Sequence, residues 1–169
     1  MKNNVKRLGR GIMFIMIVLS YANQLSGQDK VSISAGVGFL ETMNVGVKYQ
    51  INQSQIGLSI GTWFPSSNSY LYWKSLVSIS GDYYYHFGGK SQYSDLHPWY
   101  ARIGVDYLRV GKESSVENDM DAHIRLGRDC YFSKNAGISL DLGFGSYLKN
   151  ESGYNKLLPS LGMCLFFKF

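Results

Sequence analysis

Apolar residues recur at every second position through most of the chain after residue 30. In segment 98–110, for example, Trp99 and Ile103 share one face, while Arg102 and Asp106 share the other. A period of two is typical of β-strands whose two faces meet different surroundings. Eight such segments follow one another: 31–40, 44–51, 55–64, 76–87, 98–110, 121–132, 136–148 and 158–169. With no helical period between them, they predict an all-β fold, an eight-stranded antiparallel up-and-down barrel.

Alternation alone does not say which face is outside, because a soluble lipocalin-like barrel has the same period with its apolar residues inside. Charged residues make up 17% of the chain, below the roughly 25% usual for soluble domains. Serine and glycine dominate the polar face, where a water-facing surface would carry lysine and glutamate. We therefore expect the apolar face to contact lipid and the barrel to be transmembrane.

Aromatic residues cluster near the strand ends, as in the interfacial girdles of membrane barrels. With the chain starting in the periplasm, the outer rim receives Phe39, Phe64, Tyr107 and Phe144. The inner rim receives Tyr49, Tyr83, Tyr85, Phe87, Trp99, Tyr131, Phe167 and Phe169.

The connections between segments have alternating lengths in this orientation. The inner turns at 51–54 and 133–135 are short, and the outer connections at 65–75, 111–120 and 149–156 are longer, as outer-membrane barrels require. Two connections depart from the rule: 41–43 is a short outer connection, and 88–97 is a long inner one.

The first residues have the pattern of a secretory signal peptide. Four basic residues precede an apolar run at 12–19, which is too short to span a membrane, and small and polar residues follow it. We expect cleavage after Gly27, with 28–169 as the barrel domain; a retained N-terminal anchor is the alternative. Removal of these four bases from a total of 17 leaves 13 basic against 12 acidic residues. The basic character of the whole chain is thus mostly a targeting signal, and no nucleic-acid partner is expected.

Two cysteines are too few for a disulfide framework or a structural zinc site. The three histidines are scattered along the chain. We therefore assign no metal site and no cofactor.

The last twelve residues, LPSLGMCLFFKF, carry apolar side chains at alternate positions back from a final phenylalanine. Together with the signal peptide and the eight alternating segments, this ending resembles the small outer-membrane barrels of Gram-negative bacteria, the OmpA/OmpX-like and porin-like families. The resemblance implies a location in the outer membrane and insertion by the barrel-assembly machinery, with Phe167 and Phe169 in the assembly signal. Deletion of Phe169 is then expected to impair assembly more than it destabilises the finished barrel.

An outward apolar face directs eight charged residues into the lumen. An eight-stranded barrel has an interior just wide enough for side chains to fill, so the four acids and four bases are expected to pair into a structural plug. This polar network comprises Lys48, Asp82, Arg102, Asp106, Arg125, Asp129, Asp141 and Lys168.

Two outer connections carry candidate recognition chemistry. Tyr70, Tyr72 and Trp73 in 65–75 could recognise an extracellular ligand, or they could extend the aromatic girdle. Segment 111–121 has a net charge of −3 and could hold a divalent cation, but its spacing matches no EF-hand loop. A solvated acidic loop is the simpler interpretation.

Enzymes also occur on barrels of this size, and lipid A deacylases use a histidine near the outer leaflet. His123 lies near the outer end of its segment, but Arg125 stands where the deacylase family has serine. His86 and His97 belong to the opposite rim. No acid–base partner for His123 can be assigned from spacing, so we expect it to form hydrogen bonds in the lumen and predict no enzymatic activity.

Three kinds of residue test the register. Arg128 falls on the lipid face, where it either snorkels to the inner interface or follows a bulge at Gly127. Cys130 faces lipid and Cys164 the lumen, so both are predicted to be free thiols. Phe166 is an aromatic on the narrow lumen side.

The sequence thus predicts a monomeric outer-membrane barrel with a plugged lumen. Its expected role is structural or one of surface interaction through extracellular loops, with membrane lipid and lipopolysaccharide as neighbours. A narrow porin-like channel and a lipid A-modifying enzyme are the alternatives.

Overall fold

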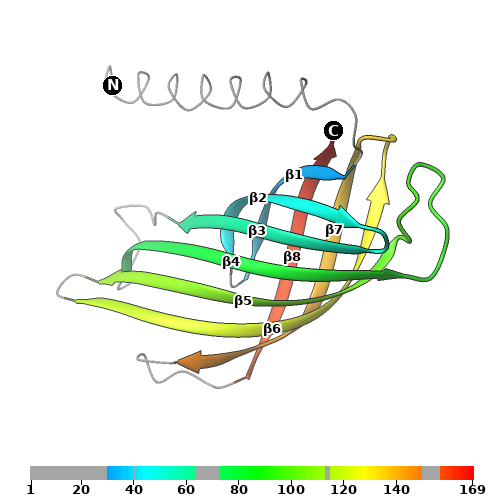
Figure 1. The fold of residues 1–169 in the computed structure, drawn as a ribbon. Helices are drawn as coiled ribbons and strands as arrows, with labels where there is room; N and C mark the ends of the chain where they lie inside the picture. Colours follow the sequence, from blue (N-terminus) through cyan, green and yellow to red (C-terminus); the bar gives the residue numbers. More distant parts are fainter. Residues whose placement is uncertain (1–29, 40, 64–72, 113–114, 150–156) are drawn as a thin grey trace, which may run out of the picture.

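The computed structural model describes residues 30–39, 41–63, 73–112, 115–149 and 157–169. Eight strands follow one another around a closed antiparallel barrel (Figure 1). The fold prediction is confirmed. The strands are β1 (Val31–Gly38), β2 (Thr42–Ile51), β3 (Ser54–Trp63), β4 (Trp73–Phe87), β5 (Trp99–Lys112), β6 (Val116–Tyr131), β7 (Ala136–Lys149) and β8 (Leu157–Lys168). No helix in the described residues is long and apolar enough to cross a membrane.

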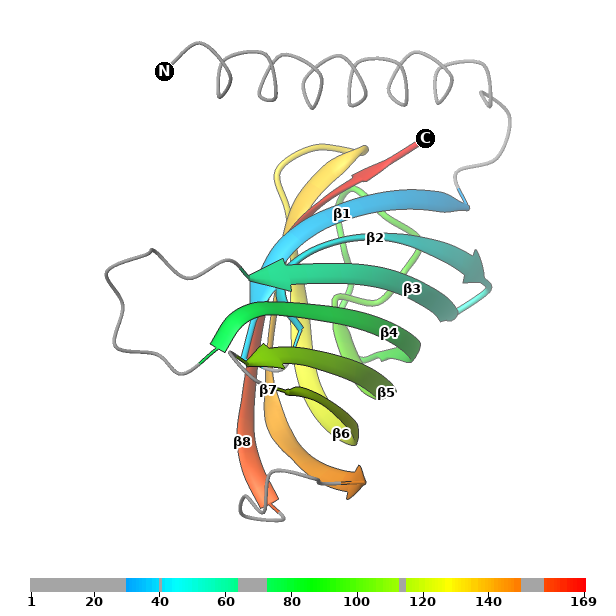
Figure 2. The ribbon, with the colours of Figure 1, turned by 90° about the vertical axis from the view of Figure 1, so that its left-hand side faces the viewer.

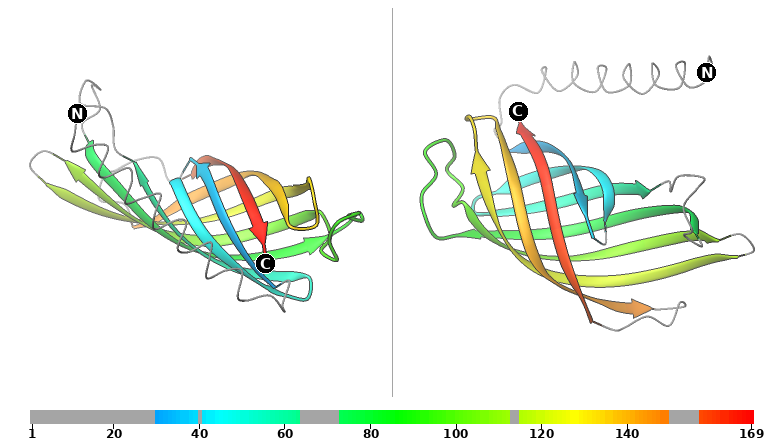
Figure 3. Two further views of the ribbon diagram at one scale, coloured as in Figure 1. Left: turned by 90° about the horizontal axis from the view of Figure 1, so that it is seen from above. Right: turned by 180° about the vertical axis from the view of Figure 1, so that it is seen from behind.

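Closure comes from pairing of the first and last strands. Ser32 lies opposite Lys168 and Gly38 opposite Gly162, so β1 and β8 are antiparallel neighbours (Figure 3). One end of the barrel, which we call the terminal rim, holds the start of β1, the end of β8, and the connections 52–53, 88–98 and 132–135. The opposite rim holds the connection between β1 and β2 and the far ends of the long strands β4, β5 and β6 (Figure 2).

The barrel is apolar outside and polar inside. Leu126, Leu142 and Leu161 on three neighbouring strands have exposed fractions of 58%, 64% and 62%. In the described part of the chain, the large hydrophobic side chains that are buried are Leu76, Tyr84, Leu96, Tyr100, Leu108 and Phe166. This arrangement is the inverse of a soluble core and has the period of a transmembrane barrel.

The prediction of a loop at 111–120 was wrong. β5 continues to Lys112 and β6 begins at Val116, so the two strands form a long hairpin. Polar residues such as Asn118 and Asp119 weaken the alternation there, although Asn118 pairs with Arg109 and Asp119 with Leu108. A polar strand end resembles a loop when hydrophobic period is the only signal.

The other register tests have clear outcomes. Arg128 is exposed and lies over the Trp99 ring at 5.3 Å, in unbroken β5–β6 pairing, so the suggested bulge at Gly127 was wrong. Cys130 and Cys164 are free thiols, as predicted. The assignment of Tyr131 to the aromatic girdle of the inner rim was wrong, because its ring packs against the ring of Phe166 at 5.2 Å, on the lumen side.

Candidate functional site

All eight charged residues assigned to the lumen are buried. Their exposed fractions run from 0% for Asp106 to 8% for Asp141. The alternation of apolar and polar positions therefore correctly predicted that these eight side chains lie on the inner face of the barrel. Their predicted partition into four acids and four bases was incomplete, however, because Glu41, Asp119 and Asp121 are also buried. In the described residues the interior holds seven carboxylates against four lysines and arginines.

Glu41 enters the lumen from the connection between β1 and β2. The Ser78 hydroxyl donates to the Glu41 carbonyl at 3.0 Å, which ties the connection to the inner face of β4. Gly61 permits this approach, because a Cβ there would lie 2.1 Å from the Glu41 carbonyl oxygen. The connection was predicted as a plain outer turn, and no period-two signal marks a turn that folds inward.

Arg102 is the centre of the ion-pair network. Its Nε donates to Asp82 Oδ1 at 2.9 Å, and its Nη2 donates to Asp82 Oδ2 at 2.7 Å. The same Nη2 contacts Glu41 Oε1, and Nη1 reaches Asp141 Oδ2 at 3.4 Å. The two-point pairing with Asp82 is the strong geometry for a guanidinium and a carboxylate.

Arg125 extends the network toward β7 and β8. Its Nη1 lies 3.1 Å from both Asp141 Oδ1 and Glu41 Oε1. The Tyr100 hydroxyl donates to the other Asp141 oxygen at 3.0 Å. Gly162 provides the space for the Asp141 carboxylate, since a Cβ at this position would lie 2.5 Å from Asp141 Oδ1. Two arginines and three carboxylates therefore link the β1–β2 connection with β4, β5, β6 and β7.

His123 lies between two carboxylates. Its Nδ1 is 2.8 Å from Asp106 Oδ2, and its Nε2 is 3.0 Å from Asp82 Oδ1. A carboxylate oxygen beside each ring nitrogen favours the imidazole form with a proton on both nitrogens, which is cationic. Gly104 makes the Asp82 contact possible, because a Cβ there would lie 2.2 Å from Asp82 Oδ1. The predicted lumen hydrogen bonding of His123 is confirmed, with partners that spacing had not revealed.

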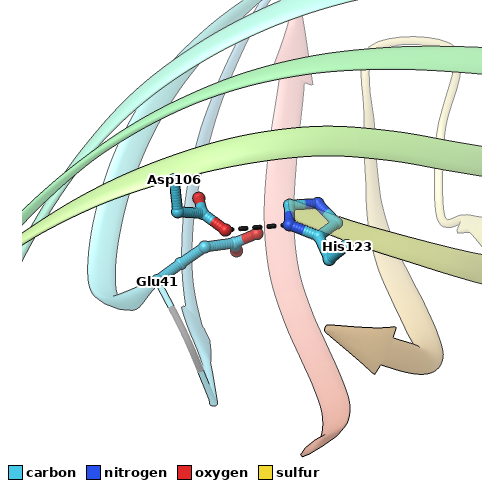
Figure 4. Close-up of side chains that lie close together, drawn as sticks. All are labelled: Glu41, Asp106 and His123. Carbon is cyan, nitrogen blue, oxygen red and sulfur yellow. Dashed lines mark hydrogen bonds and ion pairs between the residues drawn. The ribbon is translucent and has the colours of Figure 1, made fainter. Parts of the chain in front are cut away.

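Glu41, Asp106 and His123 also bring three potential metal-ligand atoms within 4.8 Å of one another (Figure 4). Arg102 and Arg125 occupy the Glu41 carboxylate, and both His123 nitrogens are taken by carboxylates. A cation at the centre of this trio would face two guanidiniums. The trio is therefore better suited to an ion-pair network than to a metal centre.

A second polar group lies toward the terminal rim. Lys48 Nζ lies 4.5 Å from the centre of the Tyr84 ring, and the Ser139 hydroxyl donates to Asp129 at 2.6 Å. Lys168 Nζ donates to Ser94 Oγ at 2.9 Å. Ser94 belongs to the connection 88–98, which this contact links to the inner face of β8.

The connection 88–98 is anchored at several points. The Gln53 side chain donates to the Asp95 carbonyl at 2.9 Å and accepts from the His97 amide at 3.1 Å. His86 Nδ1 lies 2.8 Å from the His97 carbonyl oxygen, and Leu96 is 1% exposed. The unusually long connection is thus a folded cover on this rim.

A small cavity lies between these groups. A cavity of about 20 Å³ is lined by Glu41, Lys48, Asp82, Arg102 and Asp141, among others. That volume holds roughly one water molecule.

The remaining predicted site residues lie elsewhere. Phe167 is 46% exposed on β8, its ring centre lies 5.2 Å from that of Phe169, and the Phe169 amide donates to the Val31 carbonyl at 3.0 Å. The recognition candidates Tyr70 and Tyr72 lie outside the described residues, as does the signal peptide. Trp73 begins β4, and only its backbone is described.

No family model matches the chain, and no curated protein matches it by sequence. Two solved structures share its fold. The N-terminal β-barrel domain of Pseudomonas aeruginosa OprF matches with a TM-score of 0.61 at 20% identity, over 85% of this chain and 100% of that chain. Neisserial surface protein A, NspA, matches with a TM-score of 0.51 at 12% identity, over 83% of this chain and 95% of that chain. The chain therefore has the fold of small eight-stranded outer-membrane barrels.

Proposed function

We propose that the chain is an integral outer-membrane protein whose lumen is closed and whose role is structural or one of surface interaction. The observation that carries the location is the apolar outer face, on which Leu126 and Leu142 are more than half exposed in the middle of their strands. Exposure of this apolar surface to water would cost a large free energy, and contact with lipid avoids that cost. The shared fold with OprF and NspA supports the same location.

The buried network supports a closed lumen. Arg102 and Arg125 join carboxylates from the β1–β2 connection, β4 and β7, so side chains cross the interior from several directions. Opening a solute path would separate buried ion pairs, and each broken pair leaves a charge without compensation. We infer that ions and solutes do not pass through the resting barrel.

An export signal at residues 1–27, insertion by the barrel-assembly machinery and a monomeric state complete the proposal. In the proposed orientation, the terminal rim faces the periplasm and the opposite rim faces outward among lipopolysaccharide. Tyr70, Tyr72 and Trp73 would then stand on the outer side, available to an extracellular partner. We assign no catalytic role to His123, because both of its nitrogens are engaged by carboxylates.

The location is tested by separating inner and outer membranes from cells that produce the full chain. We expect the protein in the outer-membrane fraction, resistant to urea extraction, with a gel band that shifts on heating. Recovery in the aqueous fraction with no heat-dependent shift would refute a membrane barrel.

The closed lumen needs a separate test. Planar-bilayer recording on the pure folded protein is expected to give no stable conductance. Discrete, reproducible conductance steps would favour a narrow channel, and they would leave the membrane location intact.

A further inference from the structure

One row of buried oxygen atoms takes no part in the network around Arg102. Ser80 on β4 pairs with Asp106 on β5, and Asp106 pairs with Asp121 on β6, so the three residues are neighbours across adjacent strands. Their exposed fractions are 1%, 0% and 1%. Directly opposed residues on neighbouring strands have Cβ atoms about 5 Å apart, so these side chains share one small region of the inner face.

The Ser80 hydroxyl and the Asp121 carboxyl each interact with Asp106. Even so, four oxygen atoms in this row make no hydrogen bond of normal geometry. They are Ser80 Oγ, Asp106 Oδ1 and both carboxylate oxygens of Asp121. The other Asp106 oxygen is held by His123 at 2.8 Å. Buried carboxylate oxygens without a donor are strongly destabilising, so a row of this kind calls for a proton, water or a cation.

The charge of the interior favours a cation. In the described residues, the interior holds seven buried carboxylates and four buried basic side chains, two lysines and two arginines. His123, with a carboxylate beside each ring nitrogen, adds one positive charge. The remaining excess is two negative charges. A proton shared between Asp106 and Asp121 would join two of the four oxygens and add one positive charge, whereas a divalent cation adds two.

The hydrogen bonds of the neighbouring positive groups do not reach the free oxygens of this row. His123 binds Asp106 through Oδ2, away from the free Oδ1. Arg125, four residues beyond Asp121 on β6, directs its Nη1 to Glu41 and Asp141, and its charge also acts on Asp121. Glu41 itself is committed to the two arginines, so it does not belong to this row.

We propose that Ser80, Asp106 and Asp121 form a site for a hard divalent cation, Mg²⁺ or Ca²⁺, inside the barrel. Both ions prefer carboxylate and hydroxyl oxygens, and Mg²⁺ commonly keeps several waters beside one or two carboxylates. The protein oxygens of the row supply part of a coordination shell. The cation would hold β4, β5 and β6 together on the inner face.

The test is calorimetric titration of MgCl₂ and of CaCl₂ into the full folded barrel, in a zwitterionic detergent near neutral pH. We expect one cation per chain, with a dissociation constant of about 10⁻⁴ to 10⁻³ M, as in extracellular calcium modules. Asp121→Asn is expected to weaken binding at least tenfold. Asp129→Asn is the matched control, because Asp129 is a buried carboxylate that already accepts from Ser139, and its binding is expected to stay within twofold.

Heat-modifiability of each variant reports whether it has folded, and Ser80→Ala serves as a milder variant with a few-fold loss. The proposal is overturned if the wild-type protein shows no saturable binding of either ion. Equal affinity in the wild type and Asp121→Asn, or equal losses in Asp121→Asn and Asp129→Asn, would also overturn it. None of these outcomes bears on the membrane location, which fractionation tests independently.

Discussion

Single glycines decide whether the large polar side chains fit inside this narrow barrel. Gly104 faces Asp82 and His123, Gly162 faces Asp141, and Gly127 faces the Tyr100 ring. In each case a Cβ would lie 2.5 Å or less from an atom of the neighbouring side chain. The sequence showed these glycines on the polar face, but the period of two does not reveal which side chain each one accommodates.

Replacement of Gly104 by alanine is expected to destabilise the barrel by about 1–3 kcal/mol, because the added methyl group overlaps Asp82 and His123. Urea-dependent unfolding in phospholipid vesicles, followed by tryptophan fluorescence, measures the change. Gly81→Ala is the control, since nothing lies within 4 Å of a Cβ there. Equal stability of the two variants would contradict the packing described around Gly104.

Arg102 stabilises the interior through its ion pairs with three carboxylates. Arg102→Met removes the cation that pairs with Asp82, Glu41 and Asp141, and we expect a loss of about 3–5 kcal/mol in unfolding free energy. Arg109→Met is the control, because Arg109 is exposed on the same strand and a surface change of this kind costs under about 0.5 kcal/mol. Similar losses from both variants would argue against a network centred on Arg102.

Among the elements, strands were predicted well and connections poorly. Alternation placed all eight strands, since each one separates an apolar exterior from a polar interior. It failed where both faces are polar, and so Asp119 was assigned to a connection instead of to β6. The alternation also did not predict the inward position of Glu41. That turn is held inside the barrel by contacts between distant residues, such as the hydrogen bond from Ser78 to the Glu41 carbonyl.

Gln53, from another connection, makes two of the hydrogen bonds that anchor the cover formed by 88–98. Gln53→Ala removes both hydrogen bonds to this segment, and we expect faster proteolysis of 88–98 with little change in global unfolding. Gln50→Ala is the control, because the Gln50 side chain reaches only the Asn52 carbonyl in its own turn. Unchanged cleavage in Gln53→Ala would show that other contacts hold the cover.

At the scale of the molecule, the apolar exterior and polar interior followed from the sequence, and the excess of buried acid did not. The excess depends on three carboxylates that were not assigned to the lumen from the sequence: Glu41, Asp119 and Asp121. Interior chemistry is assembled from strands far apart in the chain, as with Asp82 and His123, so residue spacing carries little information about it.

Because the outer face is apolar, a charged residue placed on it is expected to destabilise the barrel in lipid. Leu142→Arg places a cation in the middle of β7 on the outer face, and we expect a loss of about 2–4 kcal/mol when unfolding is measured in lipid bilayers. Phe132→Arg is the control at the terminal rim, where the expected loss is about 0–1 kcal/mol. A water-facing exterior would give no difference between the two positions.

The matching of glycines to large neighbours also shapes how this protein can change. Gly127 lies opposite Tyr100 and accommodates its ring, so a larger residue at 127 requires a smaller one at 100. Outward positions such as Leu126 have no such partner and accept any apolar side chain that lipid accepts. Substitutions should therefore accumulate singly on the outside and in compensating pairs on the inside, and the lumen will diverge between lineages more slowly than the surface that surrounds it.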